Sequence, residues 1–252
     1  SYPFSTIKPN HGIGYVKIDC IDKEFNTQCM PRTGYCVNHI RFVPVELMDV
    51  AGLVEGASEG KGLGNQFLDD LRQADLFMHI VDISGTTDAG GKETTEGYDP
   101  LNDVKMLENE LDLWYVGILK KVWKAFARTI QNTKQNFAEA VAKQFSGLKV
   151  TEDDVKRVLL SGKFDATKPS DWTDGKLLEF AHELRHLTKP MIIAANKVDK
   201  PSSKANYERL VAAYPKIMIV PVSADSELAL REASKAGMIE YIPGDSDFKI
   251  KE

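Results

Sequence analysis

The pattern of hydrophobic and polar positions opens with two strand-like segments. Residues 12–18 (GIGYVKI) and 42–50 (FVPVELMDV) are rich in side chains that favour strands. The connection between them, residues 26–38, is rich in turn-forming residues and contains Pro31 and Gly34. Two strands joined in this way predict an antiparallel hairpin at a sheet edge.

The next stretch alternates between loops and short regular elements. A glycine-dense loop covers residues 52–64, and the spacing of apolar residues predicts a helix over 65–74. Residues 76–83 are a short apolar run with Asp82 near its end, which is typical of a buried strand. Residues 84–100 are rich in Gly, Thr, Asp and Pro and predict a loop.

From residue 101 to residue 162 the apolar positions recur every three or four residues. This period predicts a pair of long amphipathic helices. The segment Thr151-Glu152-Asp153-Asp154 resembles a capping box and predicts the start of another helix, which ends near Gly162. Residues 177–187 predict a further helix.

The strand signal then returns twice. Residues 191–195 and 217–222 are apolar, and polar residues follow each run. Strands separated by helices predict a parallel α/β sheet, in which ligands bind beyond the carboxyl ends of the strands.

The composition of the chain is that of a globular protein. Its 252 residues contain 42% hydrophobic and 27% charged residues, with a net charge of −5, which excludes wholesale disorder and a fibrous chain. The net charge does not favour general binding to DNA or other polyanions. Three cysteines are too few for a disulfide framework and favour a reducing, cytoplasmic compartment, and no apolar run is long enough to predict a membrane span.

Three polar segments follow predicted strands in a fixed order. Asp49 and Gly52 follow the second strand, Asn196-Lys197-Val198-Asp199 follows the strand over 191–195, and Ser223-Ala224 follows the strand over 217–222. An aspartate at a strand end can hold Mg²⁺, and a glycine permits close approach of a backbone N–H to a phosphate.

The second and third segments suit guanine. The Asp199 carboxylate can accept from the ring N–H and the exocyclic amine, and the stem of Lys197 can lie along the base. Asn196 can brace the neighbouring loops, and the Ser223-Ala224 turn can present a backbone N–H to the guanine carbonyl. Each segment alone is also compatible with an ordinary turn or helix cap, but their conjunction at strand ends predicts a guanine-nucleotide site.

The motifs together resemble a known family. The chain is similar to translation-factor-class GTPases of the Obg superfamily, and within them to the YchF subfamily in its archaeal form. The resemblance covers essentially the whole chain and rests on six segments: residues 2–7 (YPFSTI) with Pro9, Asn10 and Gly12; 49–64 (DVAGLVEGASEGKGLG); 65–72 (NQFLDDLR); 196–199 (NKVD); Ser223-Ala224; and 241–245 (YIPGD).

The resemblance implies a P-loop NTPase-like α/β fold and roles for particular residues. Thr6 and Asp49 would be associated with Mg²⁺, and Gly52 would sense the γ-phosphate. Asn196, Lys197 and Asp199 would read the base, with Ser223 and Ala224 completing the site. The implied activity is GTP binding and hydrolysis to GDP and phosphate.

Two positions bear on the rate of hydrolysis. Leu53 stands where Ras-type GTPases carry a water-orienting glutamine, and its side chain has no donor or acceptor. Ser58 stands where the family commonly has histidine. The catalytic residue is therefore not identified, slow hydrolysis is expected, and a non-catalytic, nucleotide-gated ribosome- or RNA-binding module is an alternative. A third possibility is an ATPase of the YchF type, although the NKVD sequence favours GTP over ATP.

The resemblance also predicts the domain organisation. Residues 1–98 and 189–237 would form the two parts of the GTPase domain, residues 99–188 a helical insertion, and residues 238–252 the start of a TGS-like region. The phosphate-binding sequence G-x-x-x-x-G-K-[ST] does not occur in the chain. We expect that loop and the first strand of the sheet to precede Ser1, and without them this chain to be inactive.

A second candidate site contains Cys20, Cys29, Cys36 and His39. Three thiolates and one imidazole could hold Zn²⁺ in a tetrahedral site. The spacing C-x8-C-x6-C-x2-H contains no C-x2–4-C pair, which favours three free thiols instead.

The helical insertion is locally basic. Seven basic residues and one acidic residue, Glu139, lie between Trp114 and Lys149. The lysines could contact ribosomal RNA through its phosphates, whereas the interleaved aromatic residues are better explained as core. Expected partners are therefore GTP or GDP and the ribosome, without a membrane or DNA.

Overall fold

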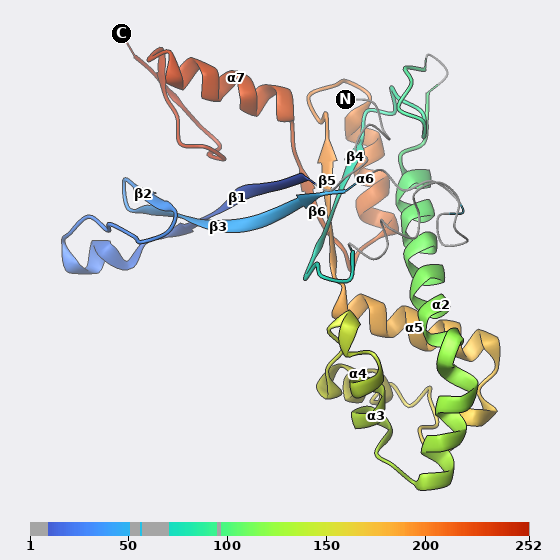
Figure 1. Cartoon of the computed structure of the whole chain (residues 1–252). Coiled ribbons are helices and arrows are strands. Elements are labelled where there is room, and N and C mark those ends of the chain that lie inside the picture. The colour runs from blue at the N-terminus through green and yellow to red at the C-terminus, as the bar shows by residue number, and fades with distance from the viewer. Residues whose placement is uncertain (1–9, 51–55, 57–70, 95–96, 252) are drawn as a thin grey trace. The chain divides into compact units, whose positions relative to one another are not determined.

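The computed structural model describes residues 10–50, 56, 71–94 and 97–251. The chain divides into two compact units (Figure 1). The first unit contains Ser1–Gly52 and Ala224–Glu252, and the second contains Leu53–Ser223.

The first unit is built on a long antiparallel ribbon. Strand β1 (Asn10–Asp19) pairs with β3 (Ile40–Asp49) along its whole length, from Asn10 opposite Asp49 to Asp19 opposite Ile40. The predicted hairpin is confirmed. Its connection also holds two elements that the turn-rich sequence did not predict, the 3₁₀-helix η1 (Ile21–Phe25) and the short strand β2 (Tyr35–Val37), which pairs with β3.

The same unit contains the last part of the chain. Helix α7 (Ala224–Lys235) is followed by β7 (Ile239–Glu240) and β8 (Lys249–Ile250), which pair antiparallel. The Lys17 Nζ on β1 donates to the Asp245 carboxylate at 2.6 Å, so an ion pair connects the ribbon to the turn before β8.

The second unit contains the predicted parallel sheet. Strands β4 (Phe77–Asp82), β5 (Met191–Asn196) and β6 (Met218–Pro221) are adjacent in that order and parallel. Helix α6 (Ser203–Ala213) connects β5 to β6, as a parallel pair requires. Within the described strands, β4 pairs with β5 alone.

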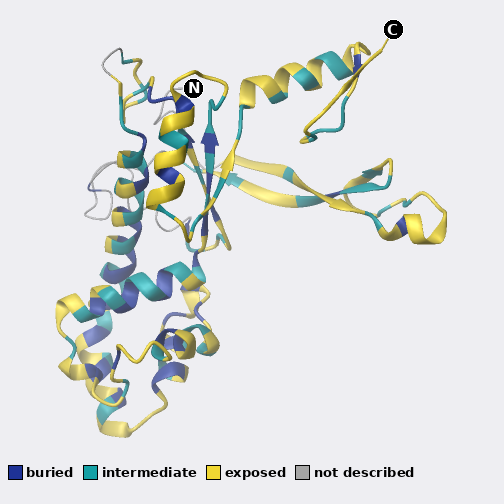
Figure 2. Ribbon diagram, turned by 180° about the vertical axis from the view of Figure 1, so that it is seen from behind, coloured by how far each residue is buried: buried dark blue, intermediate teal, exposed yellow. Residues whose placement is uncertain are grey.

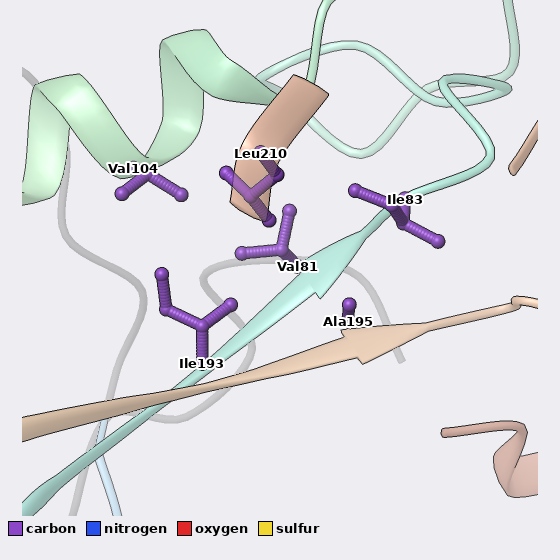
Figure 3. Close-up of a cluster of buried hydrophobic side chains, with 6 residues drawn as sticks. All are labelled: Val81, Ile83, Val104, Ile193, Ala195 and Leu210. Atoms are coloured by element: carbon purple, nitrogen blue, oxygen red, sulfur yellow. The ribbon is translucent and has the colours of Figure 1, made fainter. Parts of the chain in front are cut away.

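One face of this sheet carries the core of the unit. The buried side chains come from β4 and the residue directly after it, from β5, from α6 and from the start of the long helix α2 (Leu101–Thr133), as Figure 3 shows: Val81, Ile83, Val104, Ile193, Ala195 and Leu210. Alternate residues of a strand point to opposite faces. Met78 and Ile80 on the other face of β4 are accordingly exposed in this structure, at 52% and 67%.

The helical region corrects one sequence prediction. In place of two long helices there is one, α2, followed by the short α3 (Phe137–Gln144), α4 (Glu152–Leu159) and α5 (Asp174–Thr188). The period continues past residue 134, but Lys134 adopts a left-handed conformation and Asn136 caps α3 through its side chain. The predicted capping box is confirmed at Thr151 and Asp154.

Aromatic side chains fill the interior of this helical region. The Trp123 ring lies 5.2 Å from Trp172 and 6.2 Å from Phe180, and both Trp114 and Trp123 are buried. The preference for a core role of these aromatic residues is therefore confirmed. A search of the described helices finds none long and apolar enough to cross a membrane.

Candidate functional site

The carboxyl ends of the three parallel strands lie at one edge of the second unit. The register places Asp82 at the end of β4 opposite Asn196 at the end of β5, and Ala195 opposite Pro221 of β6. The polar segments after these strands are therefore neighbours, as the sequence predicted for a parallel sheet.

Backbone hydrogen bonds hold the turn after β5 against the end of β6. The Val222 N–H donates to the Ala195 carbonyl at 2.9 Å, and the Val198 N–H donates to the Val222 carbonyl at 3.3 Å. Lys197 has a left-handed conformation with φ of 66°, which lets the chain turn sharply directly after the strand. The Asn196 carbonyl accepts from the Ile83 N–H at 3.0 Å.

Asp199 and Ser223 come together across this junction. The Ser223 hydroxyl donates to Asp199 Oδ1 at 2.6 Å. That hydrogen bond is the main reason why the pKa of Asp199 is lower than usual. The Asp199 side chain is 36% exposed, so the carboxylate is fixed in position and still open to a ligand.

Lys197 has a partner that the sequence did not assign. Its Nζ donates to Asp82 Oδ2 at 2.6 Å, and the same carboxylate accepts from the Ser84 N–H, the Ser84 hydroxyl and the Thr87 hydroxyl. Burial raises the pKa of Asp82, but the donors, Lys197 first, outweigh it and hold the pKa below its usual value. The signal for Asp82 was present in the sequence, as a carboxylate at the end of a buried strand.

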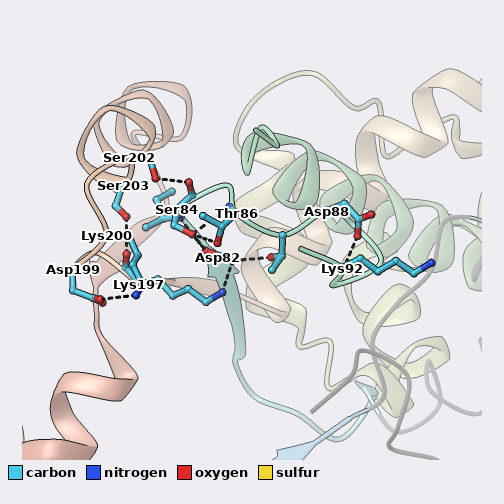
Figure 4. Close-up of polar contacts among 12 residues, drawn as sticks. Asp82, Ser84, Thr86, Asp88, Lys92, Lys197, Asp199, Lys200, Ser202 and Ser203 are labelled. Atoms are coloured by element: carbon cyan, nitrogen blue, oxygen red, sulfur yellow. Dashed lines mark hydrogen bonds and ion pairs between the residues drawn. The ribbon is translucent and has the colours of Figure 1, made fainter. Parts of the chain in front are cut away.

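Further hydrogen bonds hold the loops after β4 and β5 against each other (Figure 4). The Ser203 hydroxyl donates to the Lys197 carbonyl at 2.6 Å, and the Ser202 hydroxyl donates to the Ser84 carbonyl at 2.7 Å. The Asn206 amide donates to the Ile83 carbonyl at 3.0 Å. The start of α6 therefore fixes both loops, so the positions of Asp82 and Lys197 are set before any ligand binds.

The remaining predicted site residues fall elsewhere. Asp49 is the last residue of β3 and is exposed, and Ala224 is the first residue of α7; both belong to the first unit. Four others lie outside the described residues: Thr6, Gly52, Leu53 and Ser58.

The basic residues of the helical region do not all face solvent freely. Lys120 pairs with Asp174 at 2.7 Å, and Lys149 pairs with Asp75. A shallow depression on α2 and α3 is lined by three others together with apolar and polar neighbours: Lys121, Lys124, Arg128, Val122, Ala125, Phe126, Thr129 and Gln144. We call the three basic side chains Lys121, Lys124 and Arg128 the basic patch.

The three cysteines lie together in the first unit. The Sγ atoms of Cys20, Cys29 and Cys36 are all within 4.8 Å of one another, and no disulfide joins them. His39 is not part of this group. Its Nδ1 contacts Asp22 Oδ1 at 2.9 Å instead.

Two family models match the chain. One is described as a 50S ribosome-binding GTPase and matches residues 1–121. The other is described as "Obg-like GTPase YGR210-like, G4 motif-containing domain" and matches residues 194–252, a range that includes Asn196 to Asp199.

Individual relatives are similar over nearly all of the chain. An uncharacterized GTP-binding protein of Methanocaldococcus jannaschii is 49% identical, over 99% of this chain and 62% of that protein. The ribosome-binding ATPase YchF of Bacillus subtilis is 29% identical, over 94% of this chain and 62% of that protein. A crystal structure of a GTP binding protein from Pyrococcus horikoshii OT3 matches with a TM-score of 0.78 and 38% identity, over 93% of this chain and 63% of that one.

The parallel sheet, the turns at its strand ends and these matches define a P-loop-type GTPase domain with mixed α/β structure. Its family is one of nucleotide-binding hydrolases. Within that class the chain carries an Obg-like GTPase domain, and it is similar to proteins of the YchF subfamily. It spans 62% of the length of the M. jannaschii and B. subtilis relatives.

Proposed function

We propose that the protein binds guanine nucleotides through the turn after β5 and hydrolyses GTP slowly to GDP and phosphate. The observation that carries this proposal is the fixed Asp199 carboxylate, which accepts from Ser223 at 2.6 Å and lies two residues from Lys197 at the strand end. The match of residues 194–252 to a G4 motif-containing domain supports it.

Guanine and Asp199 are chemically complementary. An ionised carboxylate has only acceptors, and the guanine edge presents two adjacent N–H donors. Adenine lacks this donor pair and carries an amine in place of the guanine carbonyl. A buried polar group left without a partner costs about 1–3 kcal/mol, so the site favours guanine.

Lys197 contributes without reading the base edge. Its ammonium group is engaged by Asp82, which leaves the apolar stem of the side chain to lie along a purine ring. Such a contact suits any purine. Selectivity therefore depends on Asp199, and general affinity depends on Lys197.

Mg²⁺ would be associated with the Asp49 carboxylate and the Thr6 hydroxyl. The exposed carboxylate at the end of β3 is a hard oxygen donor of the kind that Mg²⁺ prefers. Bound Mg²⁺ would neutralise phosphate charge during hydrolysis. Leu53 cannot orient water, and Ser58 is a weak substitute for the family's histidine, so turnover is expected to be slow in the absence of a partner.

An ATPase is the second candidate. The B. subtilis relative is named an ATPase, as is Obg-like ATPase 1 of Caenorhabditis elegans. GTP is favoured here because the NKVD sequence provides the carboxylate that guanine requires.

A change of base preference tests the site directly. In the full-length protein, Asp199→Asn should lower GTP affinity at least about 30-fold, since one hydrogen bond to guanine is replaced by a donor facing a donor and the other is no longer to a charged group. It should raise affinity for xanthosine triphosphate, because the asparagine amide can donate to the extra carbonyl of xanthine. This gain cannot result from misfolding. If Asp199→Asn left GTP affinity unchanged, Asp199 would not be part of the nucleotide site. If the unaltered protein bound ATP more tightly than GTP, the result would support the ATPase.

The ribosome is the proposed partner, and the bound nucleotide would control the association. Support comes from the name of the B. subtilis relative and from the basic patch, whose side chains could contact rRNA phosphates. Replacing Lys121, Lys124 and Arg128 with Glu should weaken cosedimentation with ribosomes at least 10-fold. The matched control is Lys204→Glu, an exposed residue on α6. If both variants cosedimented with ribosomes equally well, the basic patch would not be part of the ribosome-binding surface.

A further inference from the structure

The tip of the ribbon in the first unit has its apolar side chains on the outside. All of residues 20–39 are described, and only Asp22, at 4% exposed, is buried among them. Ile21, Phe25 and Met30 are instead 69%, 68% and 93% exposed. Figure 2 shows this tip mostly in the colour of exposed residues. A lobe this small without an apolar core needs another source of stability.

The half-buried side chains of the lobe include three cysteines, a residue type that binds metal ions. Cys20 follows β1 directly, Cys29 lies in the loop after η1, and Cys36 is in the middle of β2. Their Sγ atoms lie within 4.8 Å of one another. A tetrahedral Zn²⁺ with Zn–S bonds of ~2.3 Å needs sulfur atoms ~3.8 Å apart, so a small contraction would complete the site.

The backbone holds these three thiols in place. The Cys20 N–H donates to the His39 carbonyl at 2.9 Å, which ties the end of β1 to the turn before β3. Cys36 pairs with Arg41 in the β2–β3 register. Three strands and one loop therefore bring the thiols to a common point, although their spacing in the sequence is wide.

Charged side chains contact the cysteines from two sides. Arg41 Nη1 donates to Cys29 Sγ at 3.6 Å. Asp22 Oδ2 accepts from the Cys29 N–H at 2.7 Å and from the Cys36 thiol at 3.8 Å. Asp22 Oδ1 contacts His39 Nδ1 at 2.9 Å. The buried carboxylate thus orients two of the cysteines and is itself oriented by His39.

We propose that Cys20, Cys29 and Cys36 bind one Zn²⁺ ion that stabilises the lobe. Three soft thiolates select Zn²⁺ over harder divalent cations. Water takes the fourth position, because the group of ligand atoms that lie within 4.8 Å of one another contains the three Sγ atoms and no atom of Asp22 or His39. Asp22 and His39 are positioning residues, in the manner of the outer ligands that orient many metal sites. The site lies outside the nucleotide-binding turn and does not depend on the proposed function.

Metal content and cobalt spectroscopy test the ligand set. The chain purified under reducing conditions should carry one Zn²⁺ by elemental analysis. Co²⁺ in its place should show thiolate-to-metal charge-transfer absorption and the intense d–d bands of a tetrahedral site. Cys36→Ser should weaken affinity at least 100-fold, whereas the control Asp19→Asn, an exposed carboxylate on β1, should leave it unchanged.

Asp22→Asn separates positioning from ligation. It should weaken affinity about 10–100-fold and leave the charge-transfer intensity per bound Co²⁺ unchanged. If His39→Ala lost Zn²⁺ as completely as Cys36→Ser, His39 would be a ligand. That result would overturn the proposal that water is the fourth ligand.

Hydrogen exchange in the unaltered chain keeps the proposal testable even if the variants misfold. A chelator should accelerate exchange of the amides of residues 20–39, and Zn²⁺ should restore their protection. Absence of stoichiometric metal, a disulfide between two of the cysteines under reducing conditions, or unchanged exchange would each overturn the proposal.

Discussion

Replacing Asp82 with asparagine removes a negative charge at the end of β4 and keeps the size of the side chain. Lys197 Nζ then loses the charge of the carboxylate that it contacts at 2.6 Å. The amide oxygen can still accept from the Ser84 N–H and hydroxyl, which both donate to Oδ1, and the Thr87 hydroxyl can turn to accept from the amide N–H that replaces Oδ2. The variant therefore reports mainly on the Asp82–Lys197 ion pair.

The exposure of the Asp82 and Lys197 side chains determines how much unfolding free energy the variant should lose. Exposed ion pairs contribute about 0.2–1 kcal/mol, whereas a hydrogen bond to a charged group contributes about 1.5–3 kcal/mol. The side chain of Asp82 is 16% exposed and that of Lys197 is 35% exposed, which places the pair between these cases. We expect Asp82→Asn to lower the free energy of unfolding by about 1.5 kcal/mol at neutral pH.

Urea unfolding followed by tryptophan fluorescence measures this loss, because buried Trp114 and Trp123 lie in the same unit. Glu208→Gln, an exposed carboxylate on α6, is the control and should change the free energy of unfolding by less than about 0.5 kcal/mol. In the full-length protein, GTP and ATP affinities should fall by the same factor, since the proposed contact of the Lys197 stem suits any purine.

The pH dependence gives a second check. The folded pKa of Asp82 is lowered, so its stabilisation is present above the unfolded value and is lost as pH falls through the folded value. The difference between wild type and Asp82→Asn should therefore shrink in acid. A variant as stable as the Glu208→Gln control at neutral pH would refute the reasoning.

Three further predictions concern the second unit. Arg185, fully buried, contacts Glu108 and Asp112, each at 2.6 Å. Arg185→Met removes this shared partner from both carboxylates and should cost about 3–5 kcal/mol of unfolding free energy in urea titrations. The pKa of Glu108 is about 2, because the contacts with His186 and Arg185 outweigh the effect of its burial. The stabilisation by the Glu108 carboxylate should therefore be complete above pH ~4.5, and the free energy of unfolding should fall by up to ~3 kcal/mol as the pH drops toward 2. Thermal unfolding of Glu108→Gln should lack most of this fall. Gly85→Ala should cost at least ~2 kcal/mol in thermal unfolding, because Gly85 has φ of +67° and an added Cβ would lie 2.4 Å from the Tyr98 carbonyl oxygen; a loss below ~0.5 kcal/mol would contradict this.

The sequence by itself determined most of the elements and which polar residues follow the parallel strands. Apolar runs followed by polar residues located β4, β5 and β6, because the hydrophobic period depends only on local geometry. The same reasoning gave the β1–β3 hairpin and the capping box of α4. The prediction of a second long helix was wrong. The apolar period continues in the sequence, but the left-handed conformation of Lys134 ends α2 and the Asn136 cap starts the short helix α3.

Only the tertiary structure decided which side chains meet. Asp82 and Lys197 are 115 residues apart in the chain, and they come into contact because β4 and β5 are adjacent and in register. The wide spacing of the cysteines argued against a cluster, yet η1, β2 and the end of β1 bring the three thiols together. Strand order and register are properties of the whole fold, because they depend on how all elements bury their apolar faces together.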